Sequence, residues 1–169
     1  MRRPLRKRRS ISIETALKID DRPMLGCFNS TLFDGIVFDG CTFVMGNNSN
    51  VIAGSLTIKN STFDFSNTTE NMAGNALNVY AQDGEMVFTG NTFIFNRDGQ
   101  RGLNLTWADW ASGNYDATQV TFTGNVFEGV ASSEAVRIVA TTGYWTGYDE
   151  AQLEADNDLN GGEIVIVTD

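Results

Sequence analysis

The sequence of 169 residues contains no histidine, only two prolines and only two cysteines. Without imidazole, a Ser-His-Asp triad, a Cys-His pair and every histidine metal ligand are excluded. Cys27 and Cys41 allow one disulfide at most, so a disulfide-rich scaffold is excluded, and whether the two are bridged stays open. Long apolar runs are also lacking. No stretch reaches the roughly 18 apolar residues of a membrane helix, and we expect no membrane span.

Basic residues are scarce outside the first nine positions. That short segment holds six of the 12 Lys and Arg residues. The rest of the chain therefore contains six basic and 21 acidic residues. Because so acidic a body repels a nucleic-acid backbone, we expect nucleic acid to contact only the tail, if any part. Polar residues interrupt the apolar positions that follow the basic run, so no signal peptide is visible. Residues 1–10 are predicted to be a disordered basic tail.

Four copies of an eight-residue pattern organise the chain. Each copy alternates apolar and polar residues, passes through two turn-formers and ends on phenylalanine. The copies lie at residues 36–43, 56–63, 86–93 and 120–127. The pattern is typical of two short strands that meet at a tight corner. Together with 17 glycines and 11 phenylalanines, it predicts an all-β fold.

A third strand with period-two alternation follows three of the corners, at residues 76–80, 102–106 and 135–139. Its apolar residues are expected to point inward, whereas Asn78, Asn104 and Arg137 are expected to point outward. Stacking the copies would bury the phenylalanines in continuous columns. The expected columns are Phe43, Phe63, Phe93 and Phe127, and Phe38, Ile58, Phe88 and Phe122.

This corner, followed by Gly-Leu-x-Leu, resembles the parallel β-helix repeat of pectate-lyase-like proteins over about residues 30–140. The resemblance implies a single-stranded, right-handed parallel β-helix, a solenoid of about four to five coils. It also implies a ladder of stacked asparagines at the corner. Asn91 and Asn125 match that ladder, whereas Ser61 and Cys41 depart from it.

The domain boundaries follow from the extent of the repeats. We expect the parallel β-helix domain to span residues 30–169. Residues 11–29 are expected to form an N-terminal cap or an incomplete coil, because they precede the first corner. The stretch at 164–167 alternates Ile and Val and is predicted to be a further strand.

Two segments, residues 106–116 and 141–149, hold all three tryptophans and three of the four tyrosines. Both follow a third strand, so we expect them on one side of the stack. Aromatic faces beside amide and guanidinium groups suit sugar rings. The alternative is that the rings cover the side of the helix or pack against another subunit. The predicted ligand-binding residues are Asn78, Asn104, Arg137, Trp107, Trp110, Tyr144 and Trp145.

The resembled group includes lyases, hydrolases, phage tailspikes and adhesins, so the fold does not fix the function. We expect a non-catalytic module of a surface or particle-associated protein, binding glycan or protein through these aromatic loops. The resemblance implies an extracellular or cell-surface location. One alternative is a polysaccharide lyase or hydrolase, or a fragment of one. Another is a structural phage-tail or capsid-associated element that self-associates.

Catalysis would need further groups. Hydrolysis needs paired carboxylates, for which Asp98, Asp109, Asp116 and Glu134 are candidates. The signatures expected of polygalacturonase-like members are not assembled, and their histidine is absent. Lyase chemistry would need a base such as Arg101 or Arg137 beside an acidic metal site. We therefore expect binding rather than catalysis.

Residues 156–161 match the opening Asp-x-Asp-x-Asn-Gly of a calcium loop. The twelfth position is Val167 rather than glutamate, so the segment is not an EF-hand. A looser calcium turn with Asp156, Asp158 and Asn160 as ligands competes with an acidic, solvated turn. No other cofactor is expected.

Overall fold

A computed structural model describes residues 12–13, 32–45, 49–69, 77–81, 85–107, 120–140 and 149–168. This part of the chain is all-β except for one short helix, which confirms the predicted class. None of its helices is long and apolar enough to cross a membrane. The elements are β1 (Ser12–Ile13), β2 (Leu32–Asp39), β3 (Thr42–Val44), β4 (Ser49–Lys59), β5 (Thr62–Asp64), β6 (Leu77–Ala81), β7 (Met86–Thr89), β8 (Thr92–Phe95), β9 (Leu103–Trp107), β10 (Val120–Thr123), β11 (Val126–Gly129), β12 (Val136–Ala140), α1 (Glu150–Ala155) and β13 (Ile164–Thr168).

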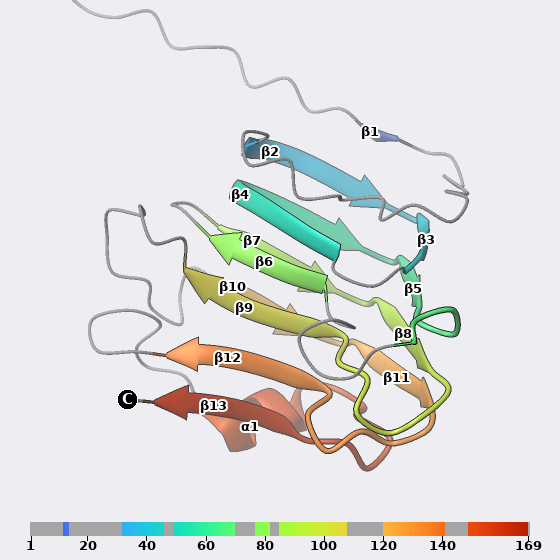
Figure 1. Cartoon of the computed structure of the whole chain (residues 1–169). Coiled ribbons are helices and arrows are strands. Elements are labelled where there is room, and N and C mark those ends of the chain that lie inside the picture. Colours follow the sequence, from blue (N-terminus) through green and yellow to red (C-terminus); the bar gives the residue numbers. More distant parts are fainter. Residues whose placement is uncertain are drawn as a thin grey trace, which may run out of the picture.

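The strands form two sheets in which every described pairing is parallel (Figure 1). The larger sheet runs β1-β2-β4-β6-β9-β12-β13; β7 also pairs with β4, and β10 pairs with β7. The smaller sheet has the order β11-β8-β5-β3. Successive copies of the repeat therefore lie side by side, with equivalent strands of neighbouring copies paired.

Strand β4 is the branch point of the larger sheet. Its residues 49–53 pair with β6, whereas its residues 56–59 pair with β7. The counterpart of a third strand and the first strand of the next repeat are thus continuous in β4. In later repeats the intervening segments are longer and divide the two strands.

Phenylalanines stack through the core in the predicted column. The ring centroids of Phe43 and Phe63 lie 4.8 Å apart, those of Phe63 and Phe93 4.8 Å apart, and those of Phe93 and Phe127 4.7 Å apart. These distances match the spacing of neighbouring strands, because the rings stand on in-register positions. The second predicted column, from Phe38 to Phe122, is also buried and in register.

A glycine immediately before β9 leaves room for this column. A Cβ atom on Gly102 would lie 2.7 Å from the Phe93 ring and 3.0 Å from the Phe127 ring. The equivalent position of the next repeat is Ala135, which is also small and buried. The glycine of the Gly-Leu-x-Leu pattern is therefore required by packing rather than by a turn.

Side-chain amides stack at the corner beside this core. Asn91 Nδ2 donates to Asn125 Oδ1 (3.1 Å), and Asn125 Nδ2 donates to Asn157 Oδ1 (2.9 Å). Ser61 continues the series, because its Oγ accepts from the Cys41 backbone N–H (3.1 Å) while its own N–H donates to Asn91 Oδ1 (3.0 Å). The predicted ladder of Asn91 and Asn125 is confirmed, and Asn157 extends it by one position.

The fifth repeat begins with α1 instead of a strand. Asp149 caps the helix, since its carboxylate accepts hydrogen bonds from two first-turn N–H groups. Asn157 follows at the corner and donates to the Phe122 carbonyl, as the ladder asparagines above it do to their own neighbours. Because Asp158 is bridged to Val126, Leu159 occupies the position of the column phenylalanine and is buried.

Candidate functional site

The three predicted polar residues form one column on β6, β9 and β12. Asn78 pairs in register with Asn104, and Asn104 pairs with Arg137. The alternate residues of these strands, such as Leu77 and Leu105, belong to the buried core. The sequence pattern therefore placed Asn78, Asn104 and Arg137 on the correct face, opposite the core.

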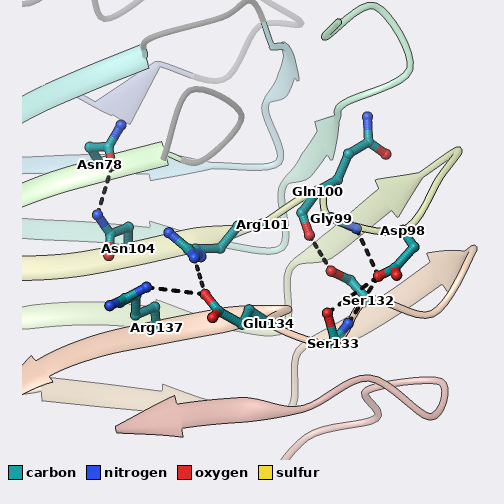
Figure 2. Close-up of polar contacts among 10 residues, drawn as sticks. All are labelled: Asn78, Asp98, Gly99, Gln100, Arg101, Asn104, Ser132, Ser133, Glu134 and Arg137. Atoms are coloured by element: carbon teal, nitrogen blue, oxygen red, sulfur yellow. Dashed lines mark hydrogen bonds and ion pairs between the residues drawn. The ribbon is translucent and has the colours of Figure 1, made fainter. Parts of the chain in front are cut away.

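The two amides of this column contact each other. Asn104 Nδ2 donates to Asn78 Oδ1 over 2.8 Å (Figure 2). Strand alternation suggests that Asn78 is open to solvent. Its side chain is on the expected face, but Asn78 is only 5% exposed. Asn104 is partly exposed, but its Oδ1 is buried and accepts no hydrogen bond from any residue that the structure describes.

Below the amides, two arginines share one carboxylate. Glu134 Oε2 accepts from Arg101 Nη2 and from Arg137 Nη1, the latter over 3.3 Å. Figure 2 shows both guanidinium groups directed at Glu134. We call these three residues the arginine cluster. It carries two positive charges and one negative charge, so one positive charge is not balanced within it.

Arg101 is the buried member of the arginine cluster. Its side chain is 2% exposed, against 31% for Glu134 and 31% for Arg137. Burial lowers the pKa of the Arg101 guanidinium, and Glu134 opposes that effect. An arginine starts from so high a pKa that it keeps its proton at neutral pH. Within the described residues Arg101 Nε has no hydrogen-bond partner.

A buried glutamine builds the turn that delivers Arg101. Gln100 is fully buried, and its Oε1 accepts from the two N–H groups at the start of its own turn. Its Nε2 donates to the Phe65 carbonyl and to Thr68 Oγ1, both over 2.8 Å. The side chain thereby fixes the turn to the preceding repeat. Arg101 is the residue that directly follows Gln100.

Two further contacts join this turn to the next one (Figure 2). Ser132 Oγ donates to the Gln100 carbonyl over 2.5 Å. Asp98 Oδ1 accepts from the backbone N–H groups of Gly99 (2.7 Å) and Ser133 (3.2 Å). The positions of Arg101 and Glu134 are therefore set by neighbouring turns that are themselves linked.

The Asp98 contacts predict a pH dependence of stability. Hydrogen bonds from the Ser133 and Gly99 N–H groups lower the pKa of Asp98. A carboxylate with a lowered folded-state pKa stabilises the fold above its unfolded pKa of about 4 and loses that contribution as the pH falls through the folded value. Acid unfolding followed by circular dichroism is expected to show a shallower decline below pH 4 for Asp98→Asn. Parallel curves for the two proteins would contradict this assignment.

Of the aromatic residues of the predicted site, the structure describes only Trp107. Trp107 is the last residue of β9, where its main chain pairs with Ala81. Trp110, Tyr144 and Trp145 lie outside the described residues, as do the carboxylates Asp109 and Asp116 and the cysteine Cys27. Their role in binding stays a prediction.

The predicted calcium ligands lie in the turn that leads to β13. Asp156 Oδ1 accepts from Gln152 Nε2, and Asp158 Oδ1 accepts from the Asn160 N–H. Asn160 Nδ2 donates to the Gly129 carbonyl. The described part of the chain contains no group of three or more Cys, Asp or Glu residues that could hold a metal ion. Calcium binding at this turn stays a prediction.

The contact between Arg101 and Glu134 was not predicted, although both residues stood out individually as chemical candidates. A usable signal was present. Each lies two residues before the first buried apolar residue of a third strand, Leu103 and Val136, and those two residues pair in register. Opposite charges at equivalent positions of adjacent repeats therefore indicated the pair.

Comparisons with protein-family models, with curated proteins and with solved structures give no match to this chain.

Proposed function

We propose that this chain is a right-handed parallel β-helix, similar in architecture to pectate-lyase-like proteins, and that it acts as a binding module rather than an enzyme. The parallel pairing of every described strand, the in-register phenylalanine column and the asparagine ladder support the architecture. The phenylalanine rings of the four corners stack at 4.7–4.8 Å, as side chains on successive coils of a solenoid do. A surface or particle-associated protein at the cell surface or outside the cell is the proposed context.

The ligand we propose is a glycan, with a protein partner as the alternative. The observation that carries the proposal is the in-register pair of partly exposed side chains Asn104 and Arg137 on one sheet face, of which Arg137 belongs to the arginine cluster. The third residue of the column, Asn78, is buried and holds the Asn104 amide. Amide and guanidinium groups supply the donors and acceptors that sugar hydroxyls require. In the sequence, β9 and β12 lead directly into the two segments that hold the three tryptophans. Aromatic rings would add the apolar faces that sugar rings pack against.

The environment of the carboxylates favours binding over hydrolysis. A glycoside hydrolase uses two carboxyl groups, roughly 5–10 Å apart, that face the scissile bond. Glu134 accepts from two arginines, and Asp98 accepts from two backbone N–H groups. Both are engaged in contacts that hold the turns in place, so we assign them a positioning role.

Affinity electrophoresis in gels that contain neutral or acidic polysaccharides tests the proposal. The intact protein is expected to be retarded by at least one polysaccharide. Trp107→Ala and Trp145→Ala are expected to weaken binding about tenfold or more, because buried aromatic contacts dominate such sites. Val130→Ala, which removes an exposed apolar side chain from the turn after β11, is the matched control. Unchanged retardation of both tryptophan variants would refute the proposed aromatic site.

A further inference from the structure

The arginine cluster has a local charge opposite to that of the chain. The sequence carries a formal net charge of −9, with 21 acidic and 12 basic residues. At the cluster, Glu134 neutralises only one of the two guanidinium groups of Arg101 and Arg137. A ligand with a single negative charge would complete the balance.

The two arginines also retain hydrogen-bond donors. A guanidinium has five N–H donors in a planar fork. Both groups contact the same oxygen, Glu134 Oε2, each through one nitrogen. Arg101 Nε has no partner among the described residues. Arg137 is the more exposed of the two, so an incoming ligand would meet it first, with Arg101 behind it.

Asn104 adds a neutral donor on the adjacent strand. It pairs in register with Arg137, and neighbouring strands lie about 4.8 Å apart. Its Nδ2 has two hydrogens, of which the described contact to Asn78 uses one. Donors on two strands suit a ligand whose acceptor oxygens diverge. A planar carboxylate has two oxygens, and one guanidinium fork can engage both of them.

We infer that this face binds the sulfate half-ester of a glycan. The ester carries one negative charge and three terminal oxygens, which matches the charge surplus and the separated donors. Arg137 and Asn104 would contact the ester, and Arg101 would position Arg137 through Glu134. This inference rests on the proposed glycan-binding function and names the substituent that the site selects.

Dextran sulfate, carboxymethyl-dextran and unmodified dextran of matched length supply the test, because they share one backbone. Using the full chain, calorimetry is expected to give the tightest binding for dextran sulfate. Arg137→Ala is expected to weaken that binding about tenfold, as a charge-assisted hydrogen bond would. Arg137→Lys, which keeps the charge but not the fork, is expected to fall in between. Each variant is first checked for native circular dichroism.

Arg97→Ala is the control for the loss of one positive charge. Its guanidinium donates to the Thr69 carbonyl, and Arg97 is not a member of the arginine cluster. The basic residues of the first nine positions are the same in every variant, so their contribution cancels in the comparison. Equal loss of affinity in Arg97→Ala and Arg137→Ala would overturn the site. Equal affinity for carboxymethyl-dextran would overturn the choice of sulfate.

Inorganic sulfate distinguishes the ester from the free ion. At matched ionic strength, sodium sulfate is expected to displace dextran sulfate no better than sodium chloride does. Displacement by sulfate at the concentration of the ester groups would make the free ion the ligand and overturn the inference. If the tryptophan variants lose binding to a polysaccharide while the arginine variants do not, the proposed function stands and this inference fails. If the intact protein binds no polysaccharide, both fail.

Discussion

Replacing Phe93 by alanine is expected to destabilise the fold by about 3–5 kcal/mol. The side chain is fully buried, and its ring stacks between Phe63 and Phe127 at centroid distances of 4.8 and 4.7 Å. Removing it takes away apolar burial and interrupts the column in its middle, where strands on both sides limit collapse into the space. Urea unfolding followed by circular dichroism measures the effect as a shift of the midpoint.

Thr92→Ala is the matched control for this substitution, because Thr92 is the preceding residue of β8 and faces away from the core. It is expected to cost less than about 1 kcal/mol, as for most surface changes.

Gly102→Ala adds a second test. The new Cβ would collide with the Phe93 ring, so Gly102→Ala is expected to cost less in the Phe93→Ala background than alone. Additive effects, or equal losses for Thr92→Ala and Phe93→Ala, would show that the column does not carry the stability assigned to it.

These columns could be predicted because alternation fixes which face of a strand a residue occupies. Once four copies are aligned on their phenylalanines, the pairing of Phe43, Phe63 and Phe93 follows without further information. The fifth repeat could not be aligned in that way. Its ladder residue Asn157 precedes Leu159 rather than phenylalanine, and a helix replaces the strand before it.

The sequence before that corner did contain a helix signal. Residues 150–155 are Glu-Ala-Gln-Leu-Glu-Ala, all strong helix formers, and they follow Asp149 at a capping position. The segment is shorter than two turns, so its propensity alone carries little weight against an all-β context. The acidic pattern at 156–161 predicts calcium ligands instead, whereas Asn157 within it belongs to the ladder.

For the candidate site, the column of Asn78, Asn104 and Arg137 was predictable because it depends only on strand alternation. The Arg101–Glu134 contact depends on turns. Seven residues separate β8 from β9, but six separate β11 from β12, so the register between the two repeats changes by one residue within the turn. Aligning the third strands on Leu103 and Val136 places Arg101 opposite Glu134. The alignment does not show that the buried Gln100 and its hydrogen bonds hold the turn in which the two residues meet.

Asn125→Leu is expected to destabilise the protein by about 3 kcal/mol or more, because it leaves buried polar groups without partners. Asn125 is fully buried, and its Nδ2 donates to the Phe88 carbonyl (3.0 Å) and to Asn157 Oδ1 (2.9 Å). Its Oδ1 accepts from the Asn91 backbone N–H (3.0 Å) and from Asn91 Nδ2 (3.1 Å). Leucine has a similar volume but can replace none of these bonds. Urea unfolding again gives the loss, and hydrogen exchange at the Asn91 N–H reports it locally.

Asn125→Ser separates hydrogen bonding from packing at this position. Serine already occupies the ladder at Ser61, where Oγ accepts from the Cys41 N–H (3.1 Å) and donates to the Lys59 carbonyl (2.8 Å). A serine at 125 would preserve an acceptor for the Asn91 N–H but would leave more space unfilled than leucine does. If hydrogen bonding dominates, Asn125→Ser is the more stable variant and keeps the Asn91 N–H protected from exchange. If Asn125→Leu proves the more stable, filling of the corner outweighs satisfaction of its polar groups, and the ladder contributes less to the fold than its contacts imply.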